Sequence, residues 1–189
     1  MVRFGEDGFD RATIRGIAAD AAVSPSLVRH HFGSKQGLRE ACDEHLVKEV
    51  GRLNARIQDS GAGAAGEMRP VPAFGRYQRY LARSLTEGAA AALFDELVRV
   101  HEDWLASSDA CRTEPALADR TARAAVRAAI SLSVTVLYDH IARTLAEDLT
   151  SDVGEARLMR AILDVSSHPS LTPEDARAAA AAIHASRTL

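Results

Sequence analysis

Small polar and basic side chains are concentrated in residues 24–30, which read Ser-Pro-Ser-Leu-Val-Arg-His. Guanidinium and imidazole N–H groups on a short helix suit phosphate oxygens and the base edges in the major groove of DNA. Arg29 is compatible with either contact, because its guanidinium donates to a phosphate or to O6 and N7 of a guanine. This composition predicts nucleic-acid recognition.

The spacing of apolar residues predicts two short helices that position these side chains. Residues 13–21 form the first helix, with Thr13 as its N-cap. Its apolar stripe consists of Ile14, Ile17, Ala18 and Ala21. Residues 25–32 form the second helix. Ser24 is its N-cap and Pro25 its first residue, where the missing N–H removes no helical hydrogen bond.

Neighbouring residues are expected to hold the second helix in place. We expect Val23 to fill the angle between the two helices and Gly33 to end the second one in a left-handed conformation. Core contacts are expected from Leu27, Val28 and Phe32. The next helix begins at Lys35, and a helix N-terminus beside a lysine predicts a phosphate site.

The letters VSPSLVRHHFGSK, followed by GL, resemble the DNA-binding signature of TetR/AcrR-type one-component regulators over about residues 4–46. The residues that carry the resemblance are Thr13, the turn Ala22-Val23-Ser24, the pair His31-Phe32, and Lys35. Two positions depart from the pattern. Ala22 replaces a glycine, which is tolerable if its φ stays negative, and Arg29 replaces a tyrosine that touches phosphate.

The resemblance implies a partner and a set of contact residues. The partner is double-stranded DNA with a palindromic operator, which a homodimer reads with two helices roughly 34–36 Å apart. The residues expected to contact DNA are Thr13, Arg15, Ser24, Pro25, Ser26, Leu27, Arg29, His30, His31 and Lys35.

Charge and cysteine content narrow the class of protein. The 189 residues carry a net charge of −3, whereas residues 1–39 carry six Lys/Arg against four Asp/Glu, or +2, which leaves −5 for the rest. A weakly basic head on an acidic body fits DNA contact at one end only.

Cys42 and Cys111 are too few for a disulfide framework or a zinc site, so we expect reduced cysteines, a cytoplasmic location and no metal or cofactor. We expect Cys42 to lie in the core. Residues 128–138, the most apolar run, are too short to cross a membrane.

The start of the chain is short for this resemblance. Only residues 1–7 precede Gly8-Phe9, so the first helix of the DNA-binding head is expected to be truncated. Either the coding sequence starts further upstream, or the chain lacks part of the head and a basic arm. A short first helix would expose apolar sides of Ile14, Ile17 and Phe32.

The remaining sequence predicts an all-α body. Helical spacing of Leu38, Cys42, Leu46, Val50, Leu53 and Ile57 predicts one helix over residues 35–58. Further helices are expected at residues 71–85, 89–107, 116–148, 154–165 and 173–186. Glycines 61, 63 and 66 match a G-x-G-x-x-G pattern, but no strand precedes them, so a loop is expected. We expect a helix-turn-helix DNA-binding domain at residues 1–48 and a helical effector-binding and dimerisation domain at residues 49–189.

Dimerisation is expected to involve the last long helices. A row of small residues on the helix at 116–148 would let another helix approach closely; it consists of Ala124, Ala128, Ser131 and Thr135. The resemblance implies a four-helix bundle that this helix and residues 154–165 form across a two-fold axis. Leu158 and Ile162 are the expected contacts from the second helix.

Aromatic and imidazole side chains in the body suggest either a pocket for a small apolar effector or a packed core. They are Tyr77, Tyr80, Phe94, His101, Trp104 and Tyr138. The candidate polar anchors are His101, Tyr138, Asp139 and His140. No metalloprotease spacing, G-x-S-x-G elbow or P-loop lysine is present, so no enzyme is expected. The interpretation is a ligand-responsive repressor; the alternatives are a helical dimeric interaction module and an architectural DNA-binding protein without an effector.

Overall fold

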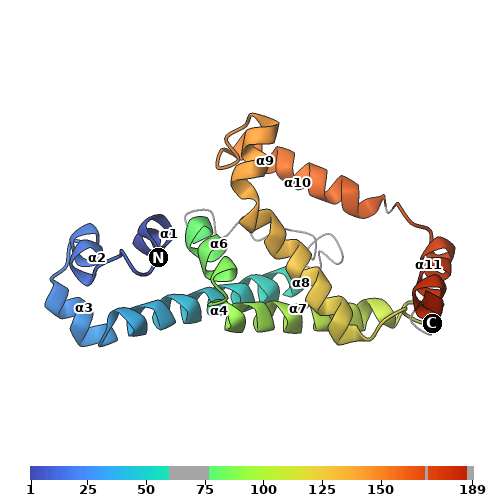
Figure 1. Cartoon of the computed structure of the whole chain (residues 1–189), viewed down its shortest axis with the longest axis horizontal. Helices are drawn as coiled ribbons and strands as arrows, with labels where there is room; N and C mark the ends of the chain where they lie inside the picture. Colours follow the sequence, from blue (N-terminus) through green and yellow to red (C-terminus); the bar gives the residue numbers. More distant parts are fainter. Residues whose placement is uncertain (60–76, 169, 187–189) are drawn as a thin grey trace.

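The computed structural model describes residues 1–59, 77–168 and 170–186, and every regular element in these ranges is a helix (Figure 1). The helices are α1 (Val2–Asp7), α2 (Ile14–Asp20), α3 (Pro25–Phe32), α4 (Lys35–Asp59), α6 (Gln78–Thr86), α7 (Ala91–Asp109), α8 (Arg120–Val136), α9 (Tyr138–Leu145), α10 (Asp152–Ser167) and α11 (Pro173–Ser186). The all-α prediction is confirmed for these residues.

Most helix boundaries follow the predictions because local signals set them. Ser24 caps α3, and Thr172 caps α11, where its hydroxyl accepts from the Asp175 N–H at 3.1 Å and donates to the Asp175 carboxylate at 2.7 Å. The helix expected at residues 71–85 is seen only as α6. Residues 71–76 and the glycine-rich segment at residues 61–66 lie outside the described residues.

The long helix expected at residues 116–148 is wrong, because two helices stand in its place. The chain bends by 59° between α8 and α9. The amide of Gln78 donates to the carbonyl of Thr135 at 3.3 Å, and the hydroxyl of Ser133 donates to the carbonyl of Ile130 at 2.6 Å. Side chains that occupy helical carbonyls are a recognised cause of such bends.

The short α1 packs directly on α6, which joins the head to the body. Phe4 is 2% exposed, and its ring lies 5.6 Å from Phe9 and 6.1 Å from Tyr80 between centroids. Gly5 lies so close to α6 that a Cβ placed on it would stand 2.6 Å from the backbone nitrogen of Tyr80. The contact therefore requires glycine at this position.

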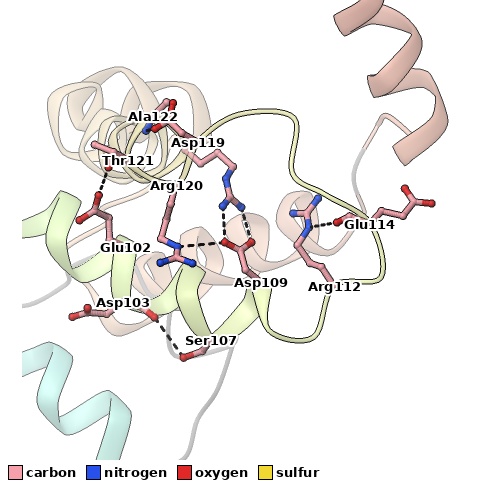
Figure 2. Close-up of polar contacts among 11 residues, drawn as sticks. Glu102, Asp103, Ser107, Asp109, Arg112, Glu114, Asp119, Arg120, Thr121 and Ala122 are labelled. Carbon is pink, nitrogen blue, oxygen red and sulfur yellow. Dashed lines mark hydrogen bonds and ion pairs between the residues drawn. The ribbon is translucent and has the colours of Figure 1, made fainter.

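The centre of the body is the packing of α7 between α4 and α8 (Figure 1). Figure 2 shows the polar contacts at the end of α7. The Asp109 carboxylate accepts from both terminal nitrogens of Arg123, at 2.8 and 2.6 Å, and from Nε of Arg120 at 3.4 Å. Arg123 and then Arg120 lower the pKa of Asp109 to about 2, so the carboxylate is charged at neutral pH.

The last two helices lie apart from this packed body (Figure 1). Arg157 on α10 donates to the carbonyl of Leu145 and to Glu147, both at 3.2 Å. Arg177 on α11 pairs with Glu114 in the connection between α7 and α8. These exposed polar contacts are weak on their own, so much of the surface of α10 and α11 remains open.

Among the described residues, no single helix has the length and apolar composition needed to cross a membrane; α8 and α9 together pass that test only as a bent pair.

The contact at Gly5 gives a test of the head–body packing. We expect Gly5→Ala to lower the free energy of unfolding by about 1–3 kcal/mol, because the added methyl group overpacks the contact with α6. Gly51→Ala is the control. A Cβ at Gly51 on α4 meets its nearest neighbour, Oε1 of Glu96, at 3.5 Å, so this change is expected to stabilise α4 by about 0.5–1 kcal/mol. Urea denaturation measures both variants; equal stability would contradict the packing described.

Candidate nucleic-acid interface

Two capped helices and a tight turn form the region predicted to contact DNA. The Thr13 hydroxyl accepts from the Gly16 N–H at 3.1 Å and begins α2. The Ser24 hydroxyl accepts from the Leu27 N–H, also at 3.1 Å, and begins α3, with Pro25 as its first residue. Both predicted N-caps are confirmed. A helix of only about two turns depends on such caps and on its neighbours.

The turn between the helices differs from the expectation in two respects. Ala22 has a φ of 54°, in the left-handed region, so the negative φ at which alanine would be tolerated here is not adopted. This conformation costs a non-glycine residue roughly 1–2 kcal/mol, and the Val23 N–H bond to the Ala18 carbonyl, at 2.9 Å, holds it. Val23 was expected to fill the angle between the helices, but its side chain is 38% exposed.

One residue of α3 anchors the helix, and most of the others face outwards. Val28 is 7% exposed, whereas Leu27 and Phe32 are 42% and 39% exposed, so the expectation that all three pack in the core is wrong for two of them. The exposed residues include Ser24, Pro25, Ser26, Leu27, Arg29, His30 and His31. The structure thus brings together, on one exposed segment, seven of the ten residues predicted to contact DNA. Thr13 and Arg15 are exposed on the neighbouring α2.

Lys35 is the last of the ten residues predicted to contact DNA, and its side chain is directed towards the loop after α1. Its ammonium group donates to the carbonyl oxygens of Phe9 and Asp10, at 2.8 and 3.1 Å, and lies 4.5 Å from the centroid of the Phe9 ring. The phosphate site predicted here is therefore replaced by an intramolecular contact. Lys35 ties the loop after α1 to the start of α4, because three donors and no acceptor suit two carbonyls and an aromatic face.

Two ion pairs that position the head, involving four charged residues, were missed by the sequence reasoning. Arg3 of α1 donates to the Asp20 carboxylate at the end of α2, at 2.9 Å from Nη2, and lowers the pKa of that carboxyl group. Arg39 of α4 lies 4.9 Å from the centroid of the Phe9 ring and 3.4 Å from Glu87. No periodic pattern indicates these pairs, since each joins residues distant in the sequence.

The hydroxyl of Tyr80 forms a polar link between α6 and α4. It donates to the carboxylate of Asp43, and the side chain is 3% exposed. Burial raises the pKa of both groups, and the Asp43 carboxylate adds to the rise for Tyr80. Tyr80 was predicted to contact an effector, but its hydroxyl is occupied and its ring packs on Phe4, so the prediction is corrected to a head–body contact.

The other residues predicted to line an effector pocket lie along the body. Trp104 donates its indole N–H to Asn54 on α4 at 2.8 Å, and the Tyr77 ring stands 6.3 Å from the His45 ring, also on α4. Phe94 packs against the core. Tyr138 begins α9, where partial burial raises its pKa. These contacts place the aromatic residues around α4 and α7, with Tyr138 apart from the others.

His101 is the exceptional polar group of the body. It is 6% exposed on α7, and its Nε2 lies 3.4 Å from the hydroxyl of Ser131 on α8. Its Nδ1 is buried, and no hydrogen-bond partner for it occurs among the described residues. Burial, together with the charge of Arg127, lowers the pKa of His101 to about 4. The ring is therefore neutral at pH 7.

The row of small residues on α8 faces α7 and not open solvent. Ala124 and Ala128 are 0% exposed inside this chain. They were expected to contact a second chain, but their burial against α7 leaves no surface for that contact. Ser131 belongs to the same row and contacts His101, and the Thr135 carbonyl accepts from Gln78. The row does allow a close helical approach, but the helix that uses it is α7. Leu158 and Ile162 of α10 are half-buried.

The arrangement of α2, turn and exposed α3 defines a helix-turn-helix head of the kind that DNA-binding proteins carry. The family description "Bacterial regulatory proteins, tetR family" matches residues 3–42, the same region. This match covers the head of the chain and confirms its resemblance to these regulators. The description names regulators, which agrees with the expectation that the chain is not an enzyme; this expectation stays a prediction.

Two relatives extend this comparison. The chain is 35% identical over 107 residues to the HTH-type transcriptional regulatory protein RaaS of Mycobacterium tuberculosis. The aligned residues are 54% of this chain and 50% of that protein. It is 44% identical over 59 residues to the HTH-type transcriptional regulator BetI of Brucella suis, or 31% of this chain and 30% of that protein. The chain thus matches half or less of the length of these relatives.

The contacts of Lys35 predict how its loss affects DNA binding. We expect Lys35→Met to weaken binding to a mixed-sequence duplex at every salt concentration without changing the slope of log K against log [salt], since no phosphate contact is lost. Arg29→Met is the matched control: if Arg29 touches phosphate, the slope falls by about 1. Fluorescence anisotropy over a salt series measures both. If the slope of log K against log [salt] falls equally in the two variants, Lys35 contacts phosphate and the intramolecular assignment is wrong.

The lowered pKa of His101 predicts a stability that depends on pH. Between its ordinary pKa of 6.5 and about 4, the unfolded chain binds a proton that the folded chain does not, so stability decreases as pH falls through this window. Above pH 6.5 His101 is neutral in both states and does not lower the free energy of unfolding. Between pH 7 and 5 its titration lowers the free energy of unfolding by about 2 kcal/mol. His101→Leu is expected to lack this loss. Urea denaturation at the two pH values compares the variant with the wild type; parallel losses would show that His101 does not titrate in this window.

Proposed function

We propose that this chain is a DNA-binding transcriptional repressor that reads a palindromic operator as a homodimer and is released by a small apolar molecule. One observation carries the proposal: the α3 face is exposed, begins at a capped N-terminus, and presents Arg29 and His30, while Val28 holds the helix from behind. A short helix with this composition suits the major groove. The names of the relatives support the regulatory role.

The proposed division into a head at residues 1–48 and a body at residues 49–189 falls inside α4, so the two parts share one helix. α4 packs on α3 at the head end and on α7 in the body. Arg39 and Asp43, both on α4, are linked to Glu87 and Tyr80 at α6. A shift of α7 or α6 on effector binding would therefore move α4 and the attached α3. Coupling of this kind is typically about 1–3 kcal/mol.

Exposed apolar residues on α8 and α10 support the proposed homodimer. Val126 and Ile130 lie one turn apart on α8 and are 58% and 64% exposed. On α10, Leu163 and Val165 are 39% and 75% exposed. Apolar side chains gathered on one region of a surface mark an interaction site more often than scattered ones do. We propose that these faces, together with Leu158 and Ile162, meet their counterparts in a second copy.

The effector is proposed to bind within the body near α4 and α7. Phe94, His101 and Trp104 of α7 provide apolar surface and polar atoms there, and Tyr77 faces α4. The buried Nδ1 of His101 has no partner among the described residues, so it offers one unused hydrogen-bonding position to a ligand. An apolar molecule with a single polar group fits such a lining.

DNA binding and dimerisation are tested together. We expect the chain to shift DNA from immediately upstream of its own gene at a salt concentration that removes binding to a mixed-sequence duplex. Arg29→Ala with His30→Ala is expected to weaken this shift at least tenfold, since good base contacts contribute about 1–3 kcal/mol each.

Ile130→Asp should give monomers in analytical ultracentrifugation and lose operator binding. The control Leu117→Asp, at a residue 57% exposed outside α8, should do neither. Binding no tighter than to the mixed-sequence duplex would refute the proposal.

A further inference from the structure

A cavity of about 510 Å³ lies where the head meets the body, away from the outward face of α3. Its walls come from α1, from one face of α6, and from both sides of the bend between α8 and α9. None of the six aromatic and imidazole residues predicted to contact an effector lines it, but Asp139, expected as a further polar anchor, does. Its volume lies in the range of small-molecule sites, so the charges on its walls indicate which molecules would fit.

The α6 wall carries two arginines with no charge partner. Arg79 and Arg83 lie one turn apart on the face that lines the cavity. Within the described ranges, no hydrogen bond or ion pair involves either side chain, although like charges at this spacing disfavour a helix. Arg83 is half-buried and reaches the end of α1, where a Cβ placed on Gly8 would stand 2.8 Å from its Nη1. A bound anionic group would satisfy these donors.

Carboxylates on the other walls would repel a ligand that carries only negative charge, so a simple anion does not match the charges of the cavity. Glu6 of α1 and Asp139 of α9 line the cavity, and no ion pair is seen for either one in the described part of the chain. Glu87 also lines it, but this carboxylate is held by Arg39 at 3.4 Å. Val136 adds an apolar surface beside the bend. The cavity thus offers positive charge on α6 and negative charge on α1 and α9.

We propose that this cavity binds a small zwitterionic metabolite. Its carboxylate pairs with Arg79 and Arg83, whose planar guanidinium groups suit two-point hydrogen bonding, and its ammonium group lies near Glu6 and Asp139. Such a molecule contacts α1, α6 and the α8–α9 bend at once. Because α1 belongs to the head, the bound molecule also fixes the head relative to the body. This regulatory consequence rests on the proposed function, whereas the binding itself does not.

The binding is tested on the free protein by isothermal titration with glycine, 4-aminobutyrate and 6-aminohexanoate, which differ in charge separation. We expect at least one of them to bind with a Kd of about 1 mM or tighter. Butyrate and butylamine, with one charge each, should bind at least tenfold more weakly. Arg79→Gln with Arg83→Gln should weaken zwitterion binding at least tenfold, and Arg99→Gln, an exposed arginine of α7 that pairs with Glu96, should leave it unchanged.

Three outcomes would overturn the site: no saturable binding of any zwitterion, equally tight binding of butyrate, or unchanged binding in the double variant. If the double variant fails to show the wild-type circular dichroism spectrum, Glu6→Gln, at an exposed residue, is used instead, with the same expected loss. Anisotropy of labelled DNA with and without the zwitterion then measures the coupling. An unchanged DNA affinity would remove the regulatory consequence and leave the binding site in place.

Discussion

α4 is the constraint on which the arrangement of this molecule depends, because both halves use it for their cores. Its buried stripe consists of Leu38, Cys42, Leu46 and Val50. α3 packs on the helix near its start, α7 packs on it further along, and Asp43 is hydrogen-bonded to α6 in between. An α-helix of 25 residues transmits displacement along its length, since each turn is hydrogen-bonded to the next. The orientation of α3 is therefore determined by packing in the body as well as by contacts in the head.

The sequence predicted the elements whose boundaries depend on local chemistry. α3 was predicted because Ser24 and Pro25 mark its start and Gly33 its end, and the structure has a positive φ of 70° at that glycine. The stripe of α4 was predicted because its residues recur at helical spacing. In each case the signal lies within a few residues of the feature, and no distant contact is needed to interpret it.

The partners of each surface could not be predicted in the same way. The small residues Ala124 and Ala128 indicate that some helix approaches α8 closely, but an intramolecular and an intermolecular helix satisfy them equally. Lys35 and Tyr80 carry groups that suit phosphate or a ligand, yet the same groups suit the carbonyl of Phe9 and the carboxylate of Asp43. Such assignments depend on which segments fold together. The bend after α8 is of the same kind, because it involves Gln78 from another helix.

The buried polar groups of the junction and the body differ in a way that bears on regulation. The Tyr80 hydroxyl and the Asp43 carboxylate satisfy one another, so their burial adds rigidity between α6 and α4. His101, by contrast, keeps one nitrogen without a partner among the described residues at the contact of α7 with α8. A buried unsatisfied nitrogen makes a packed arrangement less stable than a satisfied one would be. Since α7 packs on α4 as well as on α8, His101 lies where the packing of three helices meets, and α4 also carries α3.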